Sequence, residues 1–211
     1  FQLRMNKPVL SYWNVAASYH LFGISEWSER LPIALGGLAI IATAFALGRL
    51  AGGTTAGLLA ALVLATSPRM LLLARRIIID IHITMWTGLV LLCFALSETR
   101  PERRRRYLFL MYVAAGLGVL TKGPVAVALP VMVVLPFALL TRRWQDTLKA
   151  AFFIPGWLVT LAVFLPWAVA LTLKDGGDFF RHFLLDHNVG RFNQTMENHG
   201  GKLWYYLAAL P

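Results

Sequence analysis

The chain has 211 residues, of which 58% are hydrophobic and only 14% are charged, and its mean hydropathy is +0.63. A soluble domain carries about 25% charged residues, so this chain has too few charges to cover a globule of its size, and it is too hydrophobic for a disordered chain. The single cysteine, Cys93, excludes a disulfide framework and a cysteine-rich metal site. The composition therefore predicts an intrinsic membrane protein.

The chain begins with a polar stretch, residues 1–30, that is expected to lie outside the membrane. Within it, residues 8–22 are apolar on much of their circumference and rich in aromatic side chains, but they are too short and too polar to cross a bilayer. Such a segment is typical of an interfacial helix that lies on the membrane.

Six apolar stretches follow, and each approaches the ~20 residues that a bilayer core requires. In chain order they are residues 31–48, 54–68, 77–97, 107–121, 123–141 and 150–173. Residues 174–202 are polar and are expected to form an external loop with a short helix at 179–188, and residues 203–211 start a further apolar run. The prediction is an all-α, polytopic transmembrane helix bundle that forms one domain. The absence of an initiator Met and the apolar run at the end indicate an internal piece of a larger membrane protein.

Basic residues are concentrated in the short loops at one end of the predicted spans, which argues against a nucleic-acid-binding face despite the net charge of +10. The turns at 48–53, 98–106 and 142–149 hold nine of the twenty cations: Arg49, Arg100, Arg103, Arg104, Arg105, Arg106, Arg142, Arg143 and Lys149. By the positive-inside rule these loops are cytoplasmic. The other loops then face the periplasm or the cell exterior.

Charged residues also gather at the span ends on the predicted external side, where topology does not explain them. They are Arg69, Arg75, Arg76, Asp80, Lys122, Asp186, His187 and Arg191. One interpretation is that arginines at helix ends extend to lipid headgroups, and that Arg76 and Asp80, four residues apart, form an ordinary ion pair. The other is a shared site, which the convergence of four span ends favours because such charges are costly beside lipid.

Four fragments in this order and spacing resemble bacterial glycosyltransferases of the protein O-mannosyltransferase and aminoarabinose transferase type, which are membrane enzymes of the GT-C fold. The fragments are NKPVLSYW at 6–13, ARRIIID at 74–80, LTKGP at 120–124 and DHNVGRF at 186–192. The resemblance implies an enzyme of the bacterial inner membrane that moves a sugar from a polyprenyl-phosphate donor to a lipid, glycan or protein acceptor on the periplasmic face. No dinucleotide fingerprint or soluble nucleotide-sugar domain is visible in this sequence.

The reaction has a phosphate leaving group, so cations must be directed at the oxygens where charge develops. By resemblance, Lys7 binds the carrier phosphate and Lys122 lies in the sugar or phosphate pocket. Arg191 and either Arg75 or Arg76 are candidates for a further phosphate contact. Asp80 is expected to organise the acceptor, a metal or the base. The principal catalytic Asp of such enzymes lies in an external loop that would precede Phe1.

The sequence leaves open whether the site binds a divalent metal. The matching His in some relatives contributes to a metal site, which makes His187 and Asp186 the candidate ligands, although a lone His/Asp pair carries little information. Where some relatives have Glu just before the interfacial Lys, this chain has Asn6. His20 and His82 are interpreted as structural.

Two other functions fit a multi-span chain with proline and glycine in its spans. A transporter or lipid-exporting permease would place its ionisable residues near the bilayer midplane, often on broken helices, whereas here they collect at one face. A structural assembly subunit without a site would leave Asp80 and Lys122 unexplained.

Overall fold

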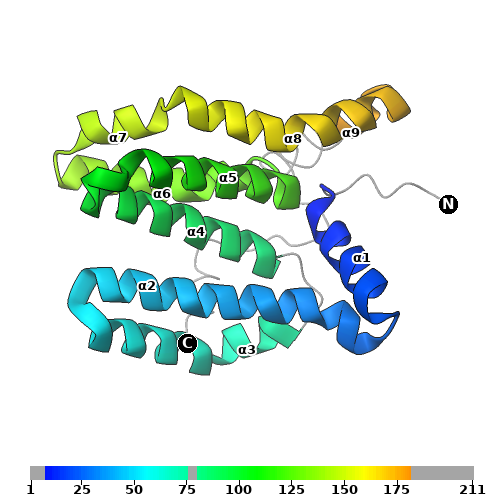
Figure 1. Cartoon of the computed structure of the whole chain (residues 1–211), viewed down its shortest axis with the longest axis horizontal. Coiled ribbons are helices and arrows are strands. Elements are labelled where there is room, and N and C mark those ends of the chain that lie inside the picture. Colours follow the sequence, from blue (N-terminus) through cyan, green and yellow to red (C-terminus); the bar gives the residue numbers. More distant parts are fainter. Residues whose placement is uncertain (1–7, 76–79, 182–211) are drawn as a thin grey trace, which may run out of the picture. The chain divides into compact units, whose positions relative to one another are not determined.

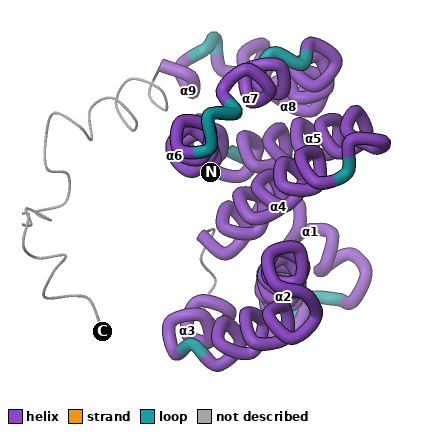
Figure 2. Tube along the Cα trace, turned by 90° about the vertical axis from the view of Figure 1, so that its left-hand side faces the viewer, coloured by secondary structure: helices purple, strands orange, loops and turns teal. Residues whose placement is uncertain are grey.

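The computed structural model describes residues 8–75 and 80–181, and all the regular structure in these ranges is helical (Figures 1 and 2). The predicted all-α class is therefore confirmed. In chain order the elements are α1 (Leu10–Phe22), α2 (Glu26–Thr66), α3 (Pro68–Arg75), α4 (Asp80–Thr99), a 3₁₀ turn η1 (Pro101–Arg103), α5 (Arg104–Lys122), α6 (Val125–Leu140), α7 (Trp144–Ala151), α8 (Ile154–Asp175) and α9 (Asp178–Arg181).

Fewer helices qualify as membrane spans than the six that the sequence predicts. Among the described residues, α2, α4 and α8 are long and apolar enough to cross a bilayer, and α6 is a shorter apolar helix. The difference has physical causes. One helix, α2, covers the first two predicted spans, α6 has only 16 residues, and α5 carries three arginines in its first turn.

The helix α2 turns back on itself where the sequence predicts a turn. Gly52 and Gly53 have non-helical backbone angles, and Gly53 has a φ of 78°, which a residue with a side chain rarely adopts. The two arms then run side by side (Figure 1). A Cβ atom on Gly57 would lie 2.7 Å from the carbonyl oxygen of Phe45, so only glycine permits this close approach of the backbones.

Pro32 lies inside the first arm of α2, and the chain replaces the hydrogen bond that this proline removes. Proline has no N–H, so the carbonyl of Ser28, four residues earlier, loses its helical donor. The hydroxyl of Ser18 in α1 donates to this carbonyl at 2.5 Å, and both serines are buried. The predicted helix at 8–22 is thus present as α1 and is fastened to α2.

The helix α4 lies between α2 and α5 (Figures 1 and 2). On the α2 side, Ile33 and Ile40 form a buried cluster with Met70 and Ile81. On the α5 side, Phe94, Leu108 and Ala150 form a second one. The helix α4, which forms an antiparallel hairpin with α5 through η1, is consequently packed on both sides.

The last predicted span, 150–173, begins too early. The chain forms the separate helix α7 first, breaks at Phe152 and Phe153, and resumes as α8 at Ile154. Pro155 is in the first turn of α8, where a missing N–H costs no hydrogen bond.

The chain divides into two compact units, residues 8–166 and the part from Trp167 onward. In the second unit the rings of Trp167 and Phe179 meet edge to face at 5.3 Å. The carboxylate of Asp175 accepts hydrogen bonds from the N–H groups of Gly177 and Phe179, which connects the end of α8 to α9. The predicted external loop is described only as far as residue 181.

Candidate functional site

Two of the predicted site residues meet at one end of the α4–α5 hairpin. Asp80 is the first residue of α4, where a carboxylate interacts favourably with the positive end of the helix dipole. Lys122 is the last residue of α5, and Gly123, with a φ of 82°, ends that helix. Pro124 follows, so the direction of the chain changes directly after the lysine.

The ammonium group of Lys122 forms an ion pair with Oδ1 of Asp80. The two residues are 42 positions apart in the sequence, so only the hairpin brings them together. The side chain of Asp80 is 50% exposed and that of Lys122 is 35% exposed. A carboxylate and a cation are therefore in contact at a place that a ligand can reach.

A cavity of about 400 Å³ lies beside α4, and one of its lining residues, His82, comes only two positions after Asp80. Residues from α1, α2 and α4 line it, among them Asn14, Ser18, Pro32, His82 and Trp86. His82 is buried, and its Nε2 lies 3.3 Å from the carbonyl oxygen of Pro32. This contact fits the structural role that the sequence assigns to His82.

A second cavity, of about 130 Å³, lies between the helices from α4 to α8 and is lined mainly by apolar side chains. Phe94, Tyr112, Pro130 and Trp157 contribute to its wall. It lies further along the hairpin, away from Asp80.

The other predicted site residues lie wholly or partly outside the described part of the chain. Arg75 is the last residue of α3, but its side chain lies outside the described part of the chain. Five more are also outside the described ranges: Lys7, Arg76, Asp186, His187 and Arg191. Their roles remain predictions, as does the ion pair between Arg76 and Asp80.

Among the described residues, no group of three His, Cys, Asp or Glu side chains is placed to hold a metal ion. The candidate ligands Asp186 and His187 lie outside these residues, so a metal held by them remains a prediction.

Comparison with known proteins settles the family. A sequence model described as dolichyl-phosphate-mannose-protein mannosyltransferase matches residues 6–169. The chain belongs to this family. The match includes α4 and α5 completely, and therefore both Asp80 and Lys122.

Two bacterial relatives carry the name undecaprenyl phosphate-alpha-4-amino-4-deoxy-L-arabinose arabinosyl transferase. The protein of Pseudomonas paraeruginosa is 31% identical over 207 residues, and that of Pseudomonas fluorescens is 33% identical over 211 residues. Each alignment covers 97% of this chain and 37% of the relative. The chain thus spans little more than a third of the length of these proteins.

A solved structure agrees with this relationship. The crystal structure of ArnT from Cupriavidus metallidurans bound to undecaprenyl phosphate superposes with a TM-score of 0.87 at 26% sequence identity, over 97% of this chain and 37% of that one. The predicted resemblance to GT-C membrane glycosyltransferases is confirmed, and with it the helical membrane fold.

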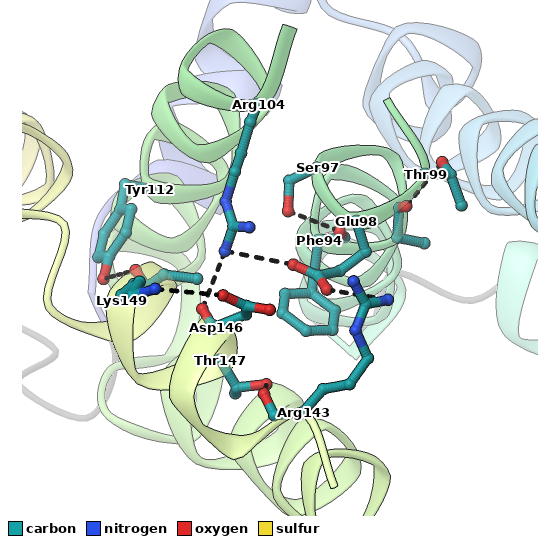
Figure 3. Close-up of polar contacts among 12 residues, drawn as sticks. Phe94, Ser97, Glu98, Thr99, Arg104, Tyr112, Arg143, Asp146, Thr147 and Lys149 are labelled. Carbon is teal, nitrogen blue, oxygen red and sulfur yellow. Dashed lines mark hydrogen bonds and ion pairs between the residues drawn. The ribbon is translucent and has the colours of Figure 1, made fainter. Parts of the chain in front are cut away.

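Sequence reasoning missed a second charged group, at the opposite end of the hairpin (Figure 3). Glu98, in the last turn of α4, is only 5% exposed. Its carboxylate lies 3.3 Å from a guanidinium nitrogen of Arg104 in α5 and 3.4 Å from one of Arg143, which precedes α7. We call Glu98, Arg104 and Arg143 the Glu98 cluster.

The Glu98 cluster extends to the backbone of α7. The guanidinium of Arg104 also donates a hydrogen bond of 2.9 Å to the carbonyl oxygen of Asp146. The side chain of Asp146 points to Lys149 at 3.4 Å, an exposed pair within α7 (Figure 3). A signal was present in the sequence: Glu98 is a carboxylate at the end of an apolar span, beside the most basic loop of the chain.

Proposed function

We propose that this chain is part of an integral-membrane glycosyltransferase that moves a sugar from a polyprenyl-phosphate donor to a lipid, glycan or protein acceptor. The proposed location is the bacterial inner membrane, with the site on the periplasmic face. The observation that carries the proposal is the exposed ion pair of Asp80 and Lys122 in a chain of this family. The names of the relatives support a donor built on undecaprenyl phosphate.

The proposed reaction breaks the bond between the anomeric carbon and the phosphate oxygen, forms a bond from the acceptor oxygen to that carbon, and releases the hydroxyl proton. Negative charge develops on the leaving phosphate, and a lysine ammonium aimed at it stabilises the transition state. Lys122 is proposed for this role, with Lys7, Arg191 and Arg75 or Arg76 as further phosphate contacts. The pairing with Asp80 keeps the ammonium in place until the donor arrives.

Asp80 is proposed to organise the acceptor hydroxyl or to assist its deprotonation. Its half-exposed carboxylate, at the first residue of a helix, can accept a hydrogen bond from a hydroxyl while it remains beside Lys122. A metal held by Asp186 and His187 would supply a further charge near the phosphate. Each of these roles is a proposal for single substitutions to test.

The relatives' names favour 4-amino-4-deoxy-L-arabinose as the sugar, whereas the family description names mannose. A competition between the two undecaprenyl-phosphate-linked sugars, assayed with the same full-length protein, distinguishes them. Transfer of the aminoarabinose unit in preference to mannose is the expected result.

The main test is turnover of the purified full-length protein in detergent micelles, without any ion gradient. We expect Lys122→Ala and Lys7→Ala to lose transfer from the polyprenyl-phospho-sugar by at least about 100-fold, since each removes a cation from the developing phosphate charge. Lys149→Ala is the matched control, because it removes an exposed lysine from α7.

Unchanged turnover in both Lys7→Ala and Lys122→Ala would contradict the site assignment. Donor that moves across a vesicle membrane without cleavage would favour the transporter instead. A loss in the Lys149→Ala control as large as that in Lys122→Ala would show that the assay reports general damage.

A further inference from the structure

The charged contacts at the two ends of the α4–α5 hairpin fit a single antiparallel register of the two helices. Asp80 pairs with Lys122 at one end, and Glu98 pairs with Arg104 at the other. Residues 80 and 98 are 18 positions apart in α4, and residues 104 and 122 are also 18 positions apart in α5. Both pairs therefore belong to the same antiparallel alignment.

This spacing has a geometric meaning. At 3.6 residues per turn, 18 residues make about five complete turns, so both charges of each helix lie on the same face, towards the partner helix. At 1.5 Å per residue the two pairs are about 27 Å apart along the axis. The hydrophobic core of a bilayer is about 30 Å thick, which places one pair near each end of a membrane-spanning hairpin.

The Glu98 cluster is suited to hold this register. Its carboxylate is 5% exposed, and a buried carboxylate is destabilising unless cations compensate it. Neither oxygen accepts a hydrogen bond of regular geometry from a described residue, so attraction to the two guanidinium groups compensates the charge. Sliding α4 by one residue would move Glu98 by about 1.5 Å along the axis and change its distance to both partners.

The short connection through η1 does not fix the register alone, because each helix can still rotate about its own axis. Arg143 and the carbonyl of Asp146 come from a segment about 40 positions further along the chain. They contact Glu98 and Arg104 from outside the hairpin. Rotation of either helix would break one of these contacts, so together they constrain both the rotation and the axial position.

We infer that Glu98 is a positioning residue: with Arg104 and Arg143 it sets the alignment of α4 against α5 that brings Asp80 opposite Lys122 at the far end of the hairpin. Its effect on sugar transfer rests on the proposed function of that pair. Its effect on helix alignment does not.

Alignment is tested directly by disulfide formation in the middle of the hairpin. In this register Thr87 of α4 is opposite Ala115 of α5, and cysteine is close to both in size. Thr87→Cys and Ala115→Cys are introduced into full-length protein in which Cys93 and any other cysteine are replaced. We expect Glu98→Gln to lower the initial rate of oxidative cross-linking several-fold, because disulfides tolerate little displacement. Lys149→Gln, at the exposed pair of α7, is the matched control and should leave the rate unchanged.

Turnover is the second readout. Per folded molecule, we expect Glu98→Gln to lower kcat for the polyprenyl-phospho-sugar about tenfold, since a displacement of about 1 Å remote from the chemistry can cost up to 100-fold. Arg104→Lys retains a cation beside Glu98 and should keep most of the activity and of the cross-linking rate. A residue that only stabilises the fold would reduce the amount of folded protein and leave kcat unchanged.

Unchanged cross-linking in a folded Glu98→Gln variant overturns the inference, whatever happens to turnover. Reduced cross-linking in a protein whose wild type transfers no sugar supports the alignment and contradicts the proposed function instead. If Glu98→Gln does not fold, Glu98→Asp keeps the charge and withdraws it by one methylene group. Its cross-linking rate must then fall for the inference to stand.

Discussion

The two ends of the α4–α5 hairpin use the same kind of charged contact in different surroundings. The Asp80–Lys122 pair is a third to a half exposed, whereas the carboxylate of Glu98 is 5% exposed and has two arginine partners. An exposed pair gains little from its attraction, because water solvates each charge well when they separate. A buried carboxylate that loses its partners has no such alternative.

The two ends are therefore suited to different tasks. The Asp80–Lys122 pair can exchange one partner for a ligand, whereas the Glu98 cluster holds helices together. Under the proposed function, the Asp80–Lys122 pair opens at little cost to admit a phosphate or a hydroxyl. The Glu98 cluster cannot open without leaving a buried charge uncompensated. Substitutions at the two ends should therefore affect different properties of the protein.

The largest expected effect is on turnover at the exposed end. Asp80→Asn should reduce sugar transfer by about 100-fold, because the amide can neither hold Lys122 by charge nor assist a hydroxyl. The free energy of unfolding should change by less than about 1 kcal/mol. Turnover and an SDS unfolding titration on the same preparation measure both. Asp146→Asn, the same substitution at the other end of the hairpin, should leave turnover unchanged. A large loss of stability in Asp80→Asn would remove the distinction between the two ends.

Arg143→Gln tests the buried end. Glu98 would keep Arg104 but lose one of its two cations, so we expect the free energy of unfolding to fall by about 2 kcal/mol, less than the about 3–5 kcal/mol for a buried charge left without any partner. The SDS titration measures this change. Arg142→Gln is the matched control: Arg142 is exposed and forms no ion pair with another described residue. Equal effects of the two substitutions would contradict the assigned role of Arg143.

Tyr112 provides a smaller test in the same half of the molecule. Its hydroxyl donates to the carbonyl oxygens of Ala150, at 3.0 Å, and Ala151, at 2.6 Å, where α7 ends. Tyr112→Phe should cost about 1 kcal/mol of unfolding free energy, because it removes the buried hydroxyl hydrogen bond, while the indole N–H of Trp157 still donates to the carbonyl of Ala151. Tyr107→Phe, on the same helix, removes a hydroxyl that makes no hydrogen bond with another described residue, and it should be close to neutral. A neutral Tyr112→Phe would mean that the remaining donors, among them the indole N–H of Trp157, satisfy these carbonyls without the hydroxyl.

The smallest effect is expected at Lys149, which forms an ion pair with Asp146 at the same end of the hairpin as Glu98. Its side chain is 74% exposed, and its partner Asp146 is 40% exposed. Lys149→Ala should change the free energy of unfolding by less than about 0.5 kcal/mol. An effect as large as that of Arg143→Gln, in the same titration, would show that burial is not what distinguishes the contacts in this region.

Local features of the fold could be predicted because local chemistry decides them. Gly52–Gly53 predicted the turn within α2, and Lys122 separated two apolar runs at the point where α5 ends. The helix α7, which occupies most of the loop predicted at 142–149, and the break that follows it were missed, because Phe152 and Phe153 are as apolar as the span after them. Hydropathy alone does not distinguish such a break from a continuous helix.

The sequence by itself determined the membrane class, the helical fold and the candidate residues, since hydropathy, helix-breaking residues and motif spacing are properties of neighbouring positions. The tertiary structure decided which charges meet. It paired Asp80 with Lys122, 42 positions away, and it buried Glu98 between Arg104 and Arg143. Such contacts depend on the rotation and axial register of packed helices, and a one-residue change in either moves a side chain by about 100° or 1.5 Å.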